Sequence, residues 1–377
     1  MTTIAPVSTD TSFRYDAHPM RVVFGPGRVT ELPDEVAHLG LHSVLVLCSP
    51  EQHGLGHRVA DLLGGRAAGV FARARMHVPI DTATAGTAEA RRVGADGCVS
   101  VGGGSAIGLG KAISLQTGLP TVCVPTTYSG SEMTPIWGLT RPDGKITGRD
   151  PVVLPRTVVY DPELTCELPA RMSATSGMNS LAHAVEALYA PDVSPIVALM
   201  AEESARCLAE ALPRVAAAPS EIGARSQALR GSWLAGACLG HTTMSLHHKL
   251  CHVLGGLFDL PHAATHAVVL PHVASFNLPA APAATEALGR ALGGDDPARA
   301  LGELGRALEV PPSLAALGLR HDDLSRVAEA TLAQPYANPR PVSREQLFDL
   351  LTRAFDGSPA APRRSEPAQS PSVPRTP

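Results

Sequence analysis

Short apolar runs alternate with longer segments of mixed polarity over residues 13–163. Runs of this kind are long enough for buried strands but too short for most helices. The segments between them have the length of helices, and this order is typical of a parallel sheet with helices on both faces. The predicted strands lie at residues 43–48, 97–101, 121–125 and 157–160.

The composition changes after Asp161–Pro162. Ala, Leu, Glu and Arg dominate as far as residue 357, with Gly and Pro mostly at breaks, which favours packed helices. The segment that follows is rich in Pro, Ser, Ala and Arg and cannot bury a core. We therefore expect an α/β domain at residues 13–163, an all-α domain at residues 164–357 and a disordered tail at residues 358–377.

Size, charge and cysteine usage narrow the class of protein. A chain of 377 residues can form two domains with separate cores. The net charge of −4 gives no general reason to expect nucleic acid or an anionic membrane as a partner. No apolar run approaches the roughly 20 residues of a membrane span, and the polar N-terminus lacks the order of a secretory signal. The scattered cysteines indicate reduced thiols in a cytoplasmic protein, and we expect Cys251 to be a packing residue.

A glycine-rich turn follows the predicted strand at residues 97–101 and precedes a predicted helix at residues 106–116. Glycines let the backbone approach a pyrophosphate closely, and the helix N-terminus offers N–H groups and a favourable dipole. A plain tight turn can have the same composition, but the strand before it and the helix after it favour a dinucleotide site. The predicted cofactor-binding residues of this turn are Gly102, Gly103, Gly104 and Ser105.

A second candidate turn follows the predicted strand at residues 121–125. Its hydroxyl groups suit the phosphates, ribose or carboxamide of a nicotinamide nucleotide, and they belong to Thr126, Thr127 and Ser129. The same segment, with Glu132 three residues after Ser129, also fits a helix N-cap. Both interpretations are compatible with a cofactor-binding role.

The choice between NADH and NADPH depends on the end of the first predicted strand. This strand ends at Ser49, which we expect to contact the cofactor, without an acidic residue that would repel a 2′-phosphate. Glu51 lies nearby and can partly replace such a residue. Lys145 is a further cofactor-binding candidate. We therefore expect either NADH or NADPH as the cofactor of an α/β dinucleotide-binding domain.

Histidines are concentrated in one part of the chain, with seven of the fifteen between His241 and His272. Imidazole is the commonest metal ligand and the usual proton shuttle near neutral pH, so this cluster indicates a site. Histidines can also collect on a polar helix face without any function. On a helix, His248 and His252 share a face at i, i+4 spacing, and His262 follows a loop that can fold back toward them.

These segments closely resemble the maleylacetate reductases, a branch of the iron-containing alcohol dehydrogenase superfamily with a dehydroquinate synthase-like fold. The resemblance covers about residues 13–357. It rests on six segments, which are Arg21–Gly27, Pro125–Gly138, Thr147–Pro151, Ser176–Glu186, His247–His252 and Tyr336–Pro341. It implies an α/β dinucleotide-binding domain followed by an all-α catalytic domain.

The resemblance also marks a departure from the metal-dependent members. In those enzymes an Asp stands at the position of Asn179 and holds a divalent metal together with three histidines, which match His183, His248 and His262. An amide oxygen is a weaker ligand for such an ion than a carboxylate. Gly108 likewise replaces an Asp that metal-dependent relatives often carry. Asn179 and the three histidines would form a vestigial metal site within the catalytic site, and we expect no essential metal.

The activity implied is reduction of the conjugated C=C of maleylacetate to 3-oxoadipate, a late step in the degradation of aromatic compounds, by a homodimer. Hydride addition to the alkene places negative charge on the ketone oxygen, which a positive or hydrogen-bonding pocket stabilises. His248, His252 and Lys249 are expected to supply this pocket, and His252 is the first choice for the histidine that donates the proton. The two substrate carboxylates need cationic partners, for which Lys249, Arg149 and Arg340 are candidates.

Three other functions remain open from the sequence. The first is a metal-dependent alcohol or aldehyde reductase that uses the three histidines. The second is a lyase, because dehydroquinate synthases share the implied fold. The third is a repurposed or non-catalytic homologue in a biosynthetic pathway, because a few pocket residues decide specificity.

Overall fold

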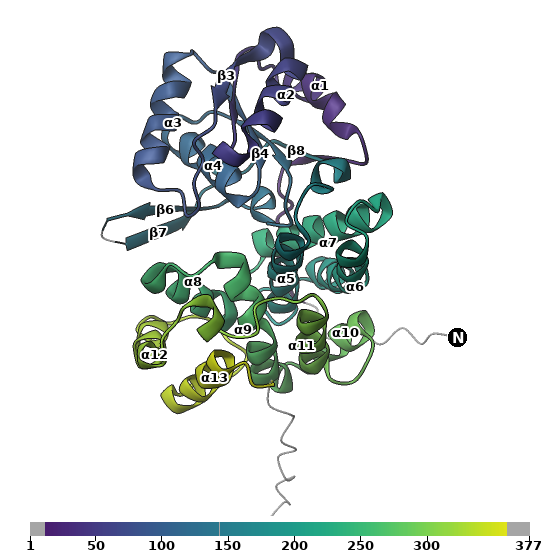
Figure 1. Ribbon diagram of the computed structural model, residues 1–377, viewed down its shortest axis with the longest axis vertical. Coiled ribbons are helices and arrows are strands. Elements are labelled where there is room, and N and C mark those ends of the chain that lie inside the picture. The colour runs from purple at the N-terminus through teal and green to yellow at the C-terminus, as the bar shows by residue number, and fades with distance from the viewer. Residues whose placement is uncertain (1–11, 143, 360–377) are drawn as a thin grey trace, which may run out of the picture.

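The computed structural model describes residues 12–142 and 144–359, without the side chain of Lys145. An α/β half and a helical half stack along the long axis of the molecule, with the sheet above and the helices below in the view of Figure 1. Most of the expected disordered tail falls on residues 360–377, which lie outside the described residues, as do residues 1–11.

The α/β half contains a six-stranded parallel sheet in the order β1-β8-β5-β4-β2-β3. The predicted strands are confirmed as β2, β4, β5 and β8, while β1 and β3 complete the sheet at its two edges. The strands are β1 (Arg21–Phe24), β2 (Val44–Leu47), β3 (Ala67–Phe71), β4 (Gly97–Gly102), β5 (Thr121–Pro125) and β8 (Thr157–Tyr160).

Helices cover both faces of this sheet because its strands are apolar on both sides. In β2, Val44 and Val46 pack with α1 and α2, whereas Leu45 and Leu47 point to the opposite face and pack with α3 and α4. These helices are α1 (Leu32–His38), α2 (His53–Leu63), α3 (Ile80–Arg92) and α4 (Gly104–Thr117). The expected doubly covered sheet is therefore present.

The strand order places a ligand crevice between β2 and β4. From β2 the chain moves outward to β3, and from β4 it moves the other way to β5. The loops that leave the carboxyl ends of β2 and β4 therefore diverge, and ligands of doubly wound sheets bind in the crevice that such a reversal opens. Both turns expected to bind the cofactor follow strands at this edge.

A two-stranded antiparallel hairpin, β6 (Ile136–Arg141) and β7 (Gly144–Arg149), was not predicted from the sequence. It extends from the α/β half on the side that faces α8, as Figure 1 shows. The hairpin pairs Ile136 with Arg149 at its base, so the last residue of β7 lies beside the first residue of β6.

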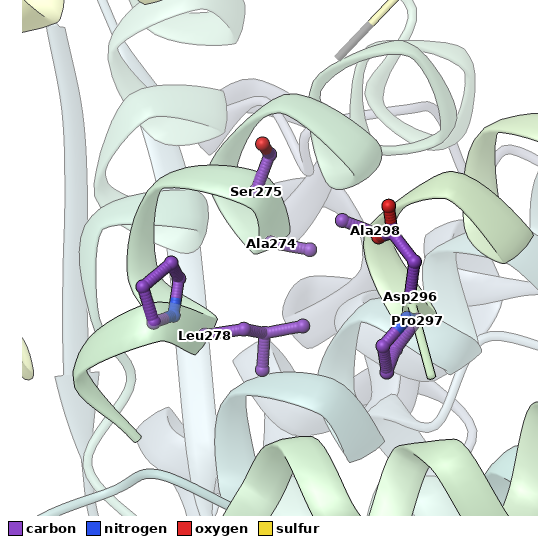
Figure 2. Close-up of a pocket in the computed structure, with 7 residues that line it drawn as sticks. Ala274, Ser275, Leu278, Asp296, Pro297 and Ala298 are labelled. Carbon is purple, nitrogen blue, oxygen red and sulfur yellow. The ribbon is translucent and has the colours of Figure 1, made fainter. Parts of the chain in front are cut away.

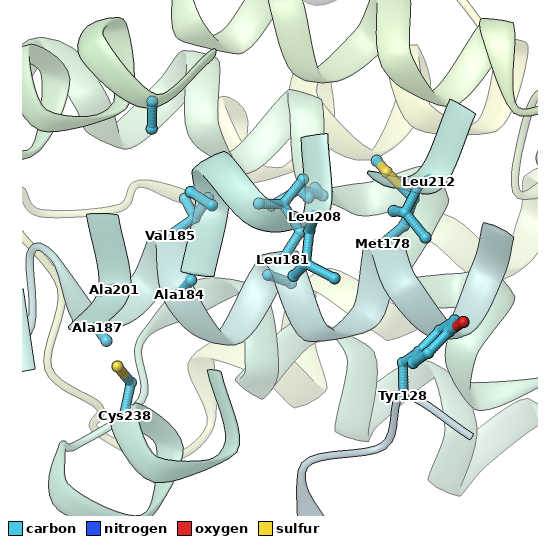
Figure 3. Packing of buried hydrophobic residues seen from close by; sticks show 14 of the residues in the cluster. Tyr128, Met178, Leu181, Ala184, Val185, Ala187, Ala201, Leu208, Leu212 and Cys238 are labelled. Carbon is cyan, nitrogen blue, oxygen red and sulfur yellow. The ribbon is translucent and has the colours of Figure 1, made fainter. Parts of the chain in front are cut away.

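The expected all-α fold of the second half of the chain is confirmed. Its helices are α5 (Ala170–Ala187), α6 (Pro195–Ala217), α7 (Ile222–His241), α8 (Leu246–Phe258), α9 (His262–Asn277), α10 (Pro282–Leu292), α11 (Pro297–Ala307), α12 (Leu324–Leu332) and α13 (Arg344–Asp356). Helix α5 is central, and its second half is buried on all sides. Figure 3 shows Met178, Leu181 and Val185 of α5 beside Leu208 and Leu212 of α6.

The two halves share buried residues. Cys123, Val158 and Tyr160 of the sheet belong to the same apolar cluster as the buried residues of α5 and α6. The expected division at residue 163 falls in a short 3-10 turn, Pro162–Thr165, between the last strand and α5. None of the described helices is long and apolar enough to cross a membrane.

Candidate active site

A large cavity lies between the two halves and has a volume of about 1850 Å³. Its walls are the loops that follow β2, β4 and β5, the β6–β7 hairpin, and the facing parts of α5, α7, α8 and α9. Sites for small ligands usually occupy about 300–1,000 Å³, so this cavity has room for a dinucleotide and a second ligand.

A second, much smaller hollow lies between α9 and α11 and is shown in Figure 2. Ala274, Leu278 and Pro297 are among the residues that line it, and its volume of about 10 Å³ is close to that of a single water. Of these two cavities, the large one can therefore hold an organic substrate and the small one cannot.

The glycine turn after β4 has the geometry expected for a phosphate site. Gly103, Gly104 and Ser105 line the cavity, and the 14-residue helix α4 begins at Gly104, so its free N–H groups face this turn. A Cβ atom on Gly103 would lie 2.9 Å from the Thr127 side chain, which leaves no room for a larger residue. Gly102 does not line the cavity, but it has a φ of 139° and accepts a hydrogen bond from the Thr126 amide.

The turn after β5 lies against the glycine turn. Thr126, Thr127 and Ser129 all line the cavity, and Gln52 Nε2 donates to Thr126 Oγ1 at 2.7 Å. The N-cap interpretation of this segment is wrong. Glu132 is fully buried and accepts a hydrogen bond from the Tyr160 hydroxyl at 2.8 Å instead of capping a helix.

A buried lysine fixes the segment that joins this turn to the hairpin. Lys111 Nζ donates to four oxygens at 2.6–2.9 Å, which belong to Ser131, Thr134 and Ile136. Burial lowers the pKa of Lys111 to about 7. Its amine is enclosed by these four oxygens, so it holds the chain between β5 and β6 and is not free to bind a substrate.

The far end of the cavity has the features expected for the adenosine part of a nucleotide. Ser49 and Glu51 line it, together with Arg58 of α2. A hydrogen bond from Ser49 is the main cause of a lowered pKa at Glu51, so this carboxylate is charged at neutral pH. Lys145 remains a prediction, because its side chain lies outside the part of the chain that the structure describes.

The histidines of three helices meet at the opposite end of the cavity. Asn179 and His183 on α5, His248 and His252 on α8, and His262 at the start of α9 all line it. The loop between α8 and α9 turns at Asp259, whose φ of 52° lies in the left-handed region. This turn brings His262 back beside His252, with ring centroids 6.4 Å apart.

Hydrogen bonds link three of these residues in one chain. His248 Nδ1 lies 2.5 Å from Glu186 Oε2, His183 Nδ1 lies 2.8 Å from His248 Nε2, and Asn179 Nδ2 lies 3.4 Å from His183 Nε2. Because a carboxylate can only accept, we assign the N–H of His248 to Nδ1. With both histidines neutral, His248 Nε2 accepts from His183 Nδ1, and His183 Nε2, which also lies 3.3 Å from the Ser129 carbonyl oxygen, accepts from Asn179. Asn179 Oδ1 is buried and has no hydrogen-bond partner among the described residues.

Glu186 is the functional residue that the sequence reasoning missed. It lies three residues after His183 on the same face of α5, so the helical spacing could have identified it. Its fully buried carboxylate also accepts from the backbone amides of Ser245, His247 and His248 at 2.8–3.3 Å. Burial alone would raise the pKa of Glu186, but the His248 hydrogen bond and the nearby histidines lower it overall, so the residue is charged.

Burial makes the inner histidines neutral. The pKa of His183 is held well below its ordinary value by burial and then by the neighbouring His248. Behind the cavity, His247 Nε2 lies 2.9 Å from His266 Nδ1, and burial lowers the pKa of His247 to about 3. These residues therefore act as hydrogen-bonding groups and not as positive charges. Cys251 packs beside them, with its thiol pKa raised by burial, as expected for a packing residue.

The three basic residues that were expected to bind the substrate carboxylates differ in whether they line the cavity. Lys249 reaches Gln334 at 3.4 Å and does not line the cavity. Arg340 also lies away from it, with its guanidinium 4.5 Å from the Phe276 ring centroid. Arg149, at the end of β7, does line the cavity. The structure thus brings Arg149, but not Lys249 or Arg340, to the site.

The donor set can be compared with what a divalent metal requires. Asn179 Oδ1 and the imidazoles of His183, His248 and His262 would be the ligands, and the unpartnered amide oxygen is available to a cation. Among the described residues, the ligand atoms that lie within 4.8 Å of one another belong to His247, Cys251 and His266, so the three cavity histidines are not gathered around one ion. The four cavity groups are neutral and would hold a metal less tightly than a set with a carboxylate. A cation held there would polarise the ketone oxygen of a substrate.

Comparison with known proteins gives a consistent result. The model of the family described as "Iron-containing alcohol dehydrogenase" matches residues 19–162, and that of "Fe-containing alcohol dehydrogenase family, C-terminal" matches residues 173–355. A maleylacetate reductase of Sphingobium indicum is 53% identical over 92% of this chain and 98% of its own length. The crystal structure of maleylacetate reductase from Agrobacterium tumefaciens is 49% identical, with a TM-score of 0.89 over 93% of this chain and 99% of that chain. A putative alcohol dehydrogenase from Ralstonia eutropha is 51% identical, with a TM-score of 0.92 over 93% and 100% of the two chains.

Proposed function

The chain belongs to the iron-containing alcohol dehydrogenase family, and we propose that it reduces the conjugated C=C of maleylacetate to 3-oxoadipate with NADH or NADPH. The observation that carries this proposal is the single cavity in which the glycine turn of β4 faces the Asn179–His183–His248 chain. Relatives that match nearly the whole chain are maleylacetate reductases, which gives the substrate.

Bound NADH or NADPH supplies a hydride to the alkene carbon that is β to the ketone. The C=C bond opens, negative charge develops on the ketone oxygen, and a proton reaches the carbon next to the ketone. His252 is the proposed proton donor, because it is exposed to the cavity on the same face of α8 as His248. Exposure lets this histidine recover a proton from solvent after each turnover.

Asn179 suits this chemistry better than an aspartate would. One N–H of its amide bonds to His183, and the second can donate to the oxygen on which charge develops. A carboxylate at this position would instead repel a doubly anionic substrate and the charge of the transition state. Because His183 is neutral, the site stabilises the enolate through oriented hydrogen bonds more than through fixed positive charge.

Both reduced nucleotides are proposed to work. Ser49 offers no negative charge against a 2′-phosphate, and Arg58 lines the same end of the cavity, while Glu51 favours a free 2′-hydroxyl. The resemblance further supports a homodimer in the cytoplasm, acting late in the degradation of aromatic compounds. Light scattering of the purified protein tests the dimer.

The reaction is proposed to need no metal, because the conjugated ketone already stabilises the negative charge and the ligand set lacks an anion. Activity with maleylacetate should therefore survive exhaustive chelation and should not rise when Fe²⁺ or Zn²⁺ is added. Replacing Asn179 by Asp should tighten Zn²⁺ binding, measured by calorimetry, while it lowers maleylacetate reduction.

The family name and the three histidines favour a second candidate, a metal-dependent alcohol or aldehyde reductase. If chelation abolishes activity and one equivalent of metal restores it, this second candidate is correct. A spectrophotometric assay of NADH and NADPH oxidation separates the two functions. The first predicts rapid turnover of maleylacetate and little turnover of simple aldehydes and ketones, and the second predicts the reverse.

A further inference from the structure

A substrate with two carboxylates needs a cationic group in the cavity that is not already neutralised. Four Lys and Arg side chains of the described residues line the cavity, namely Arg58, Arg75, Lys111 and Arg149. Arg75 is paired with Asp81 at 2.6 Å, and the Lys111 amine is enclosed by four oxygens. Arg58 lies on α2 at the end proposed for the nucleotide. Arg149 is therefore the cation left for the substrate.

Arg149 is held in place by a contact that leaves its charge available. Its Nη1 donates to the backbone oxygen of Gly240 at 2.8 Å, next to the end of α7. A carbonyl fixes the position of the guanidinium but does not neutralise it, and no carboxylate of the described residues pairs with Arg149. The remaining N–H groups of the planar fork can bind a carboxylate at two points.

The Gly240 carbonyl that holds this guanidinium is itself fixed by neighbouring polar residues. His18 Nε2 donates to the same Gly240 oxygen at 3.1 Å, and the His18 ring stacks on His241 with centroids 4.2 Å apart. His241 lines the cavity, its Nδ1 donates to the Ala237 oxygen at 2.6 Å, and its Nε2 is buried without a partner among the described residues. The Gly240 carbonyl is thus held from two sides, and Arg149 with it.

We infer that Arg149, fixed on Gly240 and flanked by His241, binds one of the two substrate carboxylates and so makes the cavity selective for dicarboxylates. This inference rests on the proposed function and specifies how its substrate is recognised. The acidic residues that line the cavity are Glu51, Glu163, Glu167 and Asp192, and of these Asp192 is bonded to Thr243, three residues after Gly240. The two oxygens of Asp192 accept from the amide and hydroxyl of Thr243 at 2.9 and 2.7 Å, so part of its charge is compensated locally.

The test compares three variants of the full-length protein. Arg149→Gln removes the charge, Arg149→Lys keeps the charge and can still reach the Gly240 oxygen, and Arg141→Gln makes the same charge change at the far end of the hairpin. Arg141 pairs with Gly144 in the ladder and does not line the cavity, so it is the matched control. For each variant we would measure KM and kcat for maleylacetate, the Kd for NADH, and the thermal midpoint.

The loss of a charge-assisted, two-point hydrogen bond at a solvated site should raise KM for maleylacetate by about 10–30-fold in Arg149→Gln. Arg149→Lys should raise KM by a smaller factor, about 3–10-fold, because lysine keeps the charge but not the fork. The Kd for NADH should stay within about twofold in both. If either folded Arg149 variant has the KM of Arg141→Gln, the inference is wrong.

A binding measurement tests this inference independently of the proposed function. Calorimetry of glutarate and of dimethyl glutarate, with the NAD⁺-loaded protein, needs no turnover. The inference predicts that the wild type binds glutarate more tightly than the diester, that Arg149→Gln loses this preference and that Arg149→Lys keeps only part of it. A wild type that fails to reduce maleylacetate yet shows the Arg149-dependent preference would overturn the function alone. An unchanged preference in the variants would overturn the inference alone.

Discussion

Replacing His252 by Ala is expected to lower kcat for maleylacetate by about 10²–10⁴, because the protonation step then depends on water instead of a positioned acid. His252 lines the cavity on α8, one helical turn after His248, and it is exposed where the inner histidines are buried. The Kd for NADH should change little, since the residues proposed to hold the nucleotide are in the glycine turn and the second turn. Steady-state kinetics and NADH fluorescence titration measure the two quantities.

A matched control is His42→Ala, because His42 is 80% exposed and lies outside the cavity. This control should keep wild-type kcat and KM. If kcat of His252→Ala stays within about threefold of the control, His252 is not the acid. The role would then pass to His262, whose ring lies 6.4 Å from His252.

The second large effect is expected at Glu186, which the structure adds to the site. Glu186→Gln should lower kcat by about 10–100-fold, because the amide cannot hold His248 in one tautomer as the carboxylate does. Breaking this buried pair should also lower the free energy of unfolding by about 3 kcal/mol. The two carboxylate oxygens of Glu186 now accept several hydrogen bonds, and the Gln amide has one oxygen with which to accept them. Kinetics and denaturant unfolding of the same preparation measure both losses.

Two results would contradict this role. A variant with wild-type kcat would show that the tautomer of His248 does not matter. A variant that loses stability but keeps the wild-type pH profile of kcat would show that Glu186 is purely structural. Glu329→Gln removes an exposed carboxylate that pairs with Arg344 and provides the control, with an expected change in unfolding free energy below about 1 kcal/mol.

The sheet and the helical half could be predicted because their sequence periods are clear. Strands such as β2 and β5 are fully buried, so they form short apolar runs, and the helices that follow have the length and composition of helices. The β6–β7 hairpin could not be predicted in this way. Its strands carry Gly, Thr, Lys and Arg because part of the hairpin lines a cavity, so they have neither a buried run nor a clean alternation.

The site was partly predictable for the same reason. Residues four apart on a helix share a face, and this rule placed Asn179 with His183 and His248 with His252. It also argues against Lys249, because adjacent residues of an α-helix point about 100° apart, and the structure directs this side chain to Gln334. The place of Arg149 depends on the hairpin and on the end of α7, which are 91 residues apart, and no local pattern contains that contact.

Burial was the property that the sequence concealed most. The histidine cluster suggested a positive pocket, but its inner members are enclosed by the packing of α5, α8 and α9, which lowers the pKa of His183 and of His247. Tertiary packing elsewhere in the molecule likewise buries Lys111 and Glu132, which hold the chain after β5 in place. Helical periodicity identifies which residues face each other, and only the tertiary packing decides whether they are charged.

We propose that hydride is transferred to the C=C of maleylacetate and not to its carbonyl group. The most direct measurement is an NMR analysis of the product formed from freshly prepared maleylacetate and NADH that carries deuterium at the transferred position. We expect 3-oxoadipate with one deuterium on the carbon β to the ketone, and a solvent-derived proton on the carbon between that position and the ketone. A product with deuterium on a new carbinol carbon, or no consumption of NADH or NADPH by maleylacetate, would contradict it.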